Sequence, residues 1–239
     1  MPHLFTSRPR QYTLFNEKAL GINKFNTELT NAVLYLVGGV TFIIGSVCFL
    51  PQYEDLFDIG AWIFFGGSLI YLVVTGQDLW ESGKYLSAQT LLSIWDWLEF
   101  TAAIVYVIGT VLFIVGSLFF LSQIDMMVAG SWCFIIGSLL FLIGACVNIV
   151  EIAKASSLVK LQLLNITAIA FALGSILFLV ASIPYLWQPI EMQEEWLLFT
   201  YVAWEYIVGS ILFFVGGIIN YYRLYSGSRT QQLTIDLPE

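Results

Sequence analysis

The chain has 239 residues, of which 59% are hydrophobic and only 11% are charged, and its mean hydropathy is +0.83. Soluble domains contain about 25% charged residues, so this composition excludes an ordinary soluble domain and indicates an all-α integral membrane protein. The net charge is −8, and the sequence contains no basic patch of the kind that binds nucleic acid.

Long uncharged runs predict six transmembrane helices. Each of the first five runs supplies the roughly 20 apolar residues that a helix needs to cross a bilayer. The sixth run does so only when it extends back to residue 197, which places Glu205 inside the helix. The predicted spans are residues 31–53, 59–77, 100–124, 126–150, 161–190 and 197–222.

The distribution of charge predicts the orientation of these spans. All Lys and Arg residues lie in the tail 1–27, between spans two and three, between spans four and five, or after span six, at Arg223 and in the tail 226–239. Short loops rich in Lys and Arg remain cytoplasmic, so we expect a multi-pass protein with both termini in the cytoplasm and an uncleaved N-terminal tail. The opposite loops carry only acids, which are Glu54, Asp55, Asp58, Asp125, Glu191, Glu194 and Glu195.

The six spans also form an internal repeat. Residues 28–81, 99–151 and 152–225 each contain two spans, and their landmarks superpose when the glycines are aligned. The third unit departs from the pattern because its outer loop is longer. The sequence therefore predicts three tandem transmembrane hairpins, with an interfacial connector at residues 82–98.

One motif, Gly-Ser followed by two apolar residues and Phe or Tyr, recurs six times. Lipid tails provide no hydrophobic drive for helix association, so small residues that permit close approach are expected at the helix contacts. The aromatic residue of the motif could fill the notch that a glycine leaves on a neighbouring helix, and the serine can bond back to its own helix. We expect packing here, with a substrate groove as the alternative. The motif residues are Gly45, Ser46, Gly67, Ser68, Gly116, Ser117, Gly137, Ser138, Gly174, Ser175, Gly209 and Ser210.

The segment between spans two and three is rich in aromatic and charged residues. It contains Trp80, Tyr85, Trp95 and Trp97 among five charges. Such a segment is typical of an interfacial helix or elbow with its rings at the level of the lipid headgroups. The alternative interpretation is a surface that docks a partner.

The repeated phrases suggest a relationship to a known family. The segments IIGSVCFLP with GAWIFFGGSLIYL, and IVGSLFFL with GSWCFIIGSLLFLIG, resemble the YrhK-like domain, a small two-helix membrane family. The resemblance would cover most of residues 28–225, with the third hairpin diverging in its loop. It implies helical hairpins in a membrane and brings no catalytic residues.

Residues capable of chemistry are scarce, so we expect neither an enzyme nor a bound cofactor or metal. The single histidine, His3, lies in the N-terminal tail. Cys48, Cys133 and Cys146 lack metal-ligand spacing. They are interpreted as small packing residues, although a disulfide between Cys48 and Cys133 is an alternative.

One ionisable residue, Glu205, lies inside a predicted span. Such residues are costly and therefore candidates for function, unless the longer outer loop lets Glu205 reach water or a headgroup. Two hypotheses remain. The protein is either a non-catalytic packing or assembly component that contacts lipids and binds itself or another membrane protein, or a channel or transporter for a small cation or solute with an acidic outer vestibule.

Overall fold

The computed structural model describes residues 21–88, 91–152, 158–187 and 192–235. These residues are almost entirely helical and contain no strand, which confirms the all-α class. All six long helices contain a stretch that is long and apolar enough to cross a membrane. In chain order they are α3 (Gly21–Cys48), α4 (Phe57–Ala88), α5 (Ile94–Phe119), α6 (Met127–Ile152), α7 (Leu158–Ser182) and α8 (Met192–Ile235).

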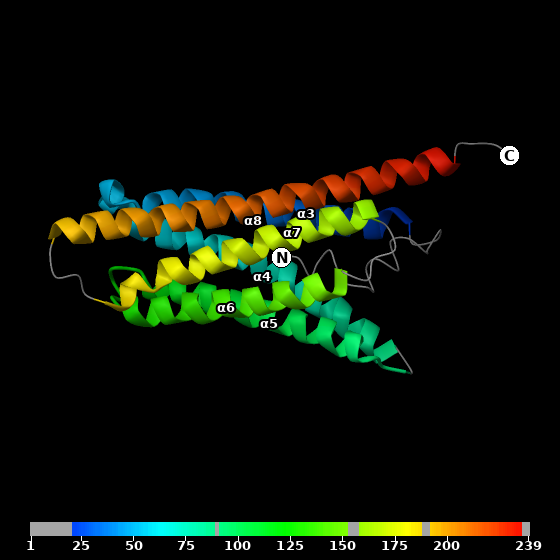
Figure 1. Ribbon diagram of the computed structural model, residues 1–239, viewed down its shortest axis with the longest axis horizontal. Helices are drawn as coiled ribbons and strands as arrows, with labels where there is room; N and C mark the ends of the chain where they lie inside the picture. The colour runs from blue at the N-terminus through cyan, green and yellow to red at the C-terminus, as the bar shows by residue number, and fades with distance from the viewer. Residues whose placement is uncertain (1–20, 89–90, 153–157, 188–191, 236–239) are drawn as a thin grey trace.

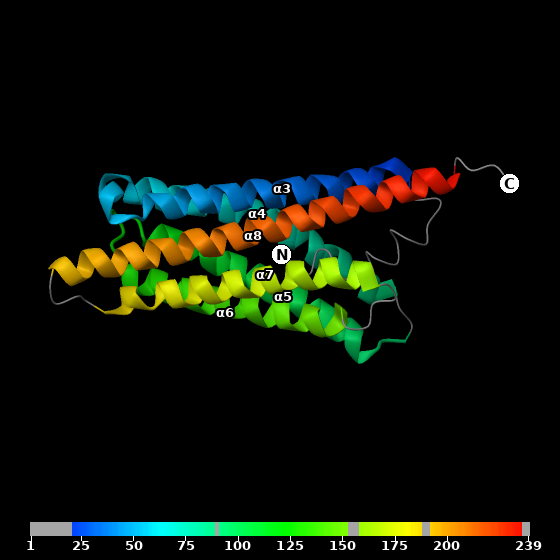
Figure 2. The same ribbon diagram turned by 45° about the horizontal axis from the view of Figure 1, so that its top comes forward.

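The helices lie side by side in one elongated bundle (Figure 1). Each helix packs along the next one in the chain, and α3 also packs along α8, so the six helices form a closed ring. The contact between α3 and α8 is visible in Figure 2. The C-terminal ends of α3, α5 and α7 lie at one end of the bundle, and those of α4, α6 and α8 lie at the other (Figures 1 and 2).

Local sequence chemistry sets the boundary between α4 and α5. The Ser93 side chain accepts a hydrogen bond from the Trp95 backbone nitrogen at 3.2 Å, and the Ser93 nitrogen donates to Asp96 Oδ2 at 2.7 Å. This reciprocal arrangement is a capping box, which satisfies amide groups at the start of a helix. Much of the expected connector at residues 82–98 is therefore built into two long helices, because α4 continues to Ala88 and α5 begins at Ile94.

The turns at the other end are held by polar contacts. A short 3-10 turn, η1 (Pro51–Leu56), joins α3 to α4. Just beyond it, the Asp58 carboxylate accepts hydrogen bonds from the backbone nitrogen and the hydroxyl of Ser122, at 2.8 and 2.5 Å. The turn after α3 is thus tied to the turn after α5. Asp125, in that second turn, has a positive φ of 50°.

Aromatic rings fill the axis of the bundle. Phe42, Phe113 and Phe178, from α3, α5 and α7, form a triangle whose ring centroids are 5.8 to 6.2 Å apart. A second triangle comes from the other three helices, with centroids 6.1 to 6.4 Å apart. It consists of Phe64, Phe134 and Tyr206. Aromatic rings at these separations are in favourable contact, so we call the two sets the aromatic triangles.

Glycines provide the space that these rings occupy. A Cβ added at Gly137 would lie 2.8 Å from the Phe113 ring, and one added at Gly209 would lie 2.8 Å from the Phe178 ring. The backbones of α5 and α6 also approach closely, since a Cβ added at Gly137 would be 3.0 Å from the Gly109 carbonyl oxygen. The rings that follow the six motif glycines all lie beside a glycine of a neighbouring helix; they are Phe49, Tyr71, Phe120, Phe141, Phe178 and Phe213.

The third unit has a different register from the one that the sequence superposition gives. Aligning the Gly-Ser motifs pairs Gly174 with Gly116. In the structure, however, the contacts of Gly174 match those of Gly109. A Cβ at Gly109 would meet Phe141 and the Gly137 carbonyl, and a Cβ at Gly174 would meet Phe213 and the Gly209 carbonyl. The first helix of the third unit is therefore shifted by one heptad. Ala181 takes the position that Gly45 and Gly116 hold in the first two units. The outer loop of the third unit is therefore longer than the other two by fewer residues than the motif alignment gives.

All three cysteines have free thiols, so the alternative of a disulfide between Cys48 and Cys133 is wrong. Both side chains lie against glycines instead. A Cβ at Gly60 would be 2.9 Å from the Cys48 Cβ, and one at Gly116 would be 3.0 Å from the Cys133 Cβ. These two cysteines therefore serve as small packing residues at close helix contacts.

Candidate functional site: a buried polar layer

A layer of polar side chains crosses the bundle beyond the aromatic core, towards the C-terminal ends of α4, α6 and α8. Each of the six helices contributes one residue, and each of these residues is at most 4% exposed. We call this set the polar layer. It consists of Asn31 in α3, Asp78 in α4, Glu99 in α5, Asn148 in α6, Thr167 in α7 and Asn220 in α8.

Helical periodicity places five of these residues on the inward faces of their helices. Asp78, Asn148 and Asn220 each follow, by seven residues, a ring of the aromatic core on the same helix. Seven residues are nearly two helical turns, so the polar residue continues the inward face of its helix. Asn31 and Thr167 lie one turn before Tyr35 and Phe171, which are themselves core residues.

The hydrogen bonds of the polar layer leave some buried acceptors open. Asn148 Nδ2 donates to the Tyr106 hydroxyl at 3.0 Å, which fixes the orientation of the amide. Asn148 Oδ1 then has no partner, and neither does Oδ1 or Nδ2 of Asn31. A buried polar atom without a hydrogen bond costs about 1–3 kcal/mol. The polar layer is therefore a place where a further polar group or an ion would be stabilised.

The donor set restricts what could bind. Among the residues that the structure describes, no group of three or more His, Cys, Asp and Glu side chains could hold a metal. The polar layer has two carboxylates, Asp78 and Glu99, and its remaining oxygens are amide or hydroxyl groups. Such a site offers hard oxygen ligands and no soft sulfur or imidazole ligand.

The motif serines lie in the core and mostly bond within the protein. The hydroxyls of Ser46, Ser117 and Ser175 donate to the carbonyl oxygens one turn earlier, at 2.7 to 2.9 Å. Ser46 Oγ also lies 3.1 Å from Ser210 Oγ, which links α3 to α8. The hydroxyls of Ser68 and Ser138 are buried without a partner.

Glu205 lies apart from the polar layer, near the opposite end of α8. Its side chain is half-buried, between the exposed Trp204 and the fully buried Tyr206. Tyr206 belongs to an aromatic triangle, and its hydroxyl lies 2.8 Å from Ser182 Oγ. The structure therefore does not bring Glu205 together with Asp78 or Glu99.

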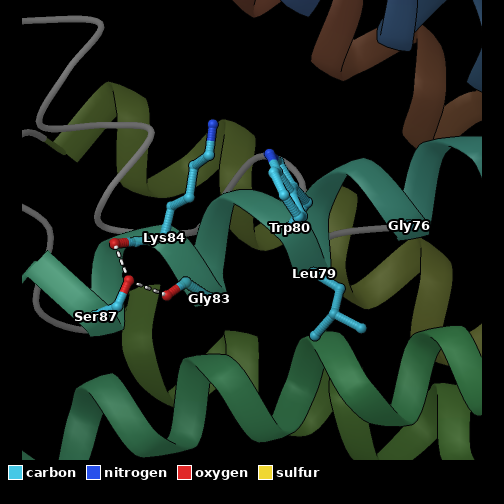
Figure 3. Close-up of a pocket in the computed structure, with 6 residues that line it drawn as sticks. All are labelled: Gly76, Leu79, Trp80, Gly83, Lys84 and Ser87. Atoms are coloured by element: carbon cyan, nitrogen blue, oxygen red, sulfur yellow. Dashed lines mark hydrogen bonds between the residues drawn. The ribbon is translucent and has the colours of Figure 1, made fainter.

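A separate hollow of 470 Å³ lies on the outer surface of α4 (Figure 3). Lys84 and Trp80 point the same way beside it, with Lys84 Nζ 5.0 Å from the centre of the Trp80 ring. Ser87 donates back to the carbonyl oxygens of Gly83 and Lys84, at 3.1 and 3.0 Å. An exposed indole next to a lysine is the pattern expected at the level of the lipid headgroups. Because Trp80 and Lys84 are both exposed, this hollow adds no buried ligand group.

Comparison with known proteins agrees with the internal repeat. The family model for YrhK-like proteins matches three times, at residues 27–82, 97–152 and 159–224. The chain therefore belongs to the YrhK-like protein family. No curated protein and no solved structure matches the chain.

The sequence contains a signal for the polar layer outside the Gly-Ser motifs. Asp78, Asn148 and Asn220 occupy the same place, shortly before the end of each family match. A short polar residue at the same inward position of three apolar helices is itself an indication of a buried polar site.

Proposed function

We propose that the protein is a non-catalytic, six-span membrane protein built from three helical hairpins, and that it serves as a packing or assembly component of a membrane complex. Its tails at residues 1–27 and 226–239 face the cytoplasm, and the acidic turns face the other side. Both tails lie outside the residues whose side chains the structure describes. The distribution of Lys and Arg supports this orientation.

The observation that carries the proposal is the closed axis. In each aromatic triangle the ring centroids are at most 6.4 Å apart, a distance at which rings touch and leave no room for a hydrated ion. A conduit needs polar groups along its length, whereas the axis at the aromatic triangles is lined by aromatic carbon. The bundle is therefore suited to packing and assembly.

Exposed tryptophans support a position across the bilayer. Trp62 and Trp80 both project from α4 into the surroundings. At about 1.5 Å per residue they are separated by about 27 Å along the helix, close to the roughly 30 Å thickness of a hydrocarbon core. Trp132 and Trp204 are exposed at the position equivalent to Trp62 in the other two units.

The surface around α4 and α5 is the part best suited to a partner. Trp80, Leu91, Ile94 and Trp97 are all exposed there. Buried aromatic anchors carry much of the energy of protein interfaces. This surface would bind either a second copy of the chain or another membrane protein.

Gentle solubilisation tests the assembly proposal. The full chain should be recovered in a particle larger than one protein in its detergent micelle. Trp80→Ala with Trp97→Ala should release it as a folded monomer, while the control Trp62→Ala with Trp132→Ala, at the other end of the bundle, should not. A monomer in the mildest detergents and in crosslinked membranes would contradict the proposal.

The alternative is a pathway for a small cation or solute, with Glu205 near its mouth. The acidic turns and the half-buried position of Glu205 favour this interpretation. It requires the aromatic triangles to open. A flux that depends on Glu205 in purified protein would separate the two functions.

A further inference from the structure

The hollow on the outer surface of α4 has an apolar end and a polar end. Its described lining residues are Gly76, Leu79, Trp80, Gly83, Lys84 and Ser87. Steps of three or four residues place them on one stripe of the helix, which extends about 16 Å at about 1.5 Å per residue. Gly76 and Leu79 lie towards the middle of α4, whereas Lys84 and Ser87 lie next to its end at Ala88. The hollow is therefore amphipathic along the helix axis.

Lys84 brings a positive charge to the polar end. Its Nζ lies 5.0 Å from the centre of the Trp80 ring, and both side chains project from the same side of α4 (Figure 3). Within the described residues, no carboxylate forms an ion pair with Lys84. The acids nearest in the chain, Asp78 and Glu81, are not among the described residues that line the hollow. An anion is therefore the charge that complements this end.

Two glycines make the helix surface low beneath the hollow. A Cβ added at Gly76 would meet no atom within 4 Å, and one added at Gly83 would meet only the Phe100 ring, at 3.7 Å. Gly67 in the same helix differs, because its added Cβ would lie 2.9 Å from the Phe42 ring. Close packing between helices thus requires Gly67 but neither Gly76 nor Gly83. At these two positions the absence of a side chain lets an acyl chain approach the backbone.

We propose that the hollow binds one anionic phospholipid, with its phosphate at Lys84 and an acyl chain against Gly76 and Leu79. The apolar end points towards the middle of the bundle and the lysine towards its end, which is the polarity of a phospholipid within a leaflet. Basic residues near a membrane surface favour anionic lipids over zwitterionic ones. The proposal rests on the proposed position of the bundle across a bilayer, and it places the lipid in the leaflet where α4 ends.

Lipid binding to the purified full chain tests the role of Lys84. The protein in a mild detergent should be titrated with phosphatidylglycerol or with phosphatidylcholine of the same acyl chains, and the bound lipids counted by native mass spectrometry. We expect one phosphatidylglycerol per chain to bind about fivefold more tightly than phosphatidylcholine, the effect of one lysine. Lys84→Gln should abolish this preference and Lys84→Arg should keep it. The control Arg223→Gln, which also removes one positive charge, should leave it unchanged.

A second pair of variants tests the shape of the hollow. Gly76→Leu should fill the apolar end and reduce the retained phosphatidylglycerol by one molecule per chain. The fold tolerates this change because a Cβ at Gly76 would meet no atom within 4 Å. The matched control is Gly66→Leu, at a glycine of α4 that is equally open but does not line the hollow, and it should retain the lipid.

Three results would overturn the lipid site: equal affinity for the two lipids in the wild type, an unchanged preference in Lys84→Gln, or retention of the lipid in Gly76→Leu. Displacement of phosphatidylglycerol by inorganic phosphate, but not by chloride at the same ionic strength, would also overturn it, because the site would then bind a free anion. Alkaline carbonate distinguishes these failures from a failure of the proposed function. Release of the chain from membranes would contradict its position across the bilayer, whereas a retained chain without lipid preference would contradict the lipid site alone.

Discussion

The ring of Phe42 lies 2.9 Å from the position that a Cβ on Gly67 would occupy, whereas a Cβ on the adjacent Gly66 would have no neighbour within 4 Å. Gly67→Leu should therefore lower the free energy of unfolding by about 1–3 kcal/mol through overpacking. Gly66→Leu should be neutral or stabilising, by up to about 1 kcal/mol, because Leu favours helix more than Gly. Thermal unfolding in detergent would measure both. Equal effects of the two substitutions would contradict the close packing of α3 against α4.

The shifted register of the third unit makes its own prediction. Ser182 takes the place that Ser46 and Ser117 hold in the other units, and its hydroxyl lies 2.8 Å from the Tyr206 hydroxyl. Tyr206→Phe should cost about 0.5–1.5 kcal/mol, the usual worth of a buried hydrogen bond. Ser182→Ala should have a similar cost, and the double variant should cost less than the sum of the two. Strict additivity, measured by the same unfolding assay, would show that the two hydroxyls do not interact.

The turn between α5 and α6 contains a residue in the left-handed region. Asp125 has a φ of 50°, a conformation that costs L-residues about 1–2 kcal/mol and costs glycine almost nothing. Asp125→Gly should therefore raise the unfolding temperature, and Asp125→Val should lower it. If both variants lowered the temperature, a contact of the carboxylate and not the backbone conformation would determine stability at this turn.

The all-α class, the six helices and the family were predictable from the sequence, because long apolar runs and the repeated motif are local signals. The register of α7 was not, since Gly174 and Ala181 both supply a small residue and only contacts with α8 distinguish them. The polar layer was missed for a similar reason. Asp78 and Glu99 stand at the ends of apolar runs, where a charged residue usually faces water, and only the packing of neighbouring helices encloses them.

The predicted orientation can be tested by labelling single cysteines in intact cells, in a background that lacks Cys48, Cys133 and Cys146. Cysteines at Asp55 and Asp125 lie in the acidic turns and should react with an impermeant reagent added outside. A cysteine at Lys84, near the other end of α4, should react only after the membrane is opened. Labelling at position 84 from outside would show that the orientation is reversed or that one of the spans does not cross the membrane.

The claim that the aromatic triangles close the bundle is tested most directly by flux through the purified protein. The full chain should be reconstituted in liposomes, and the movement of K⁺, Na⁺ and protons should be followed with fluorescent indicators. The account predicts rates equal to those of empty liposomes, both for the wild type and for Glu205→Gln. A flux well above the empty control that is diminished by Glu205→Gln would show that the axis opens, and would establish the protein as a conduit.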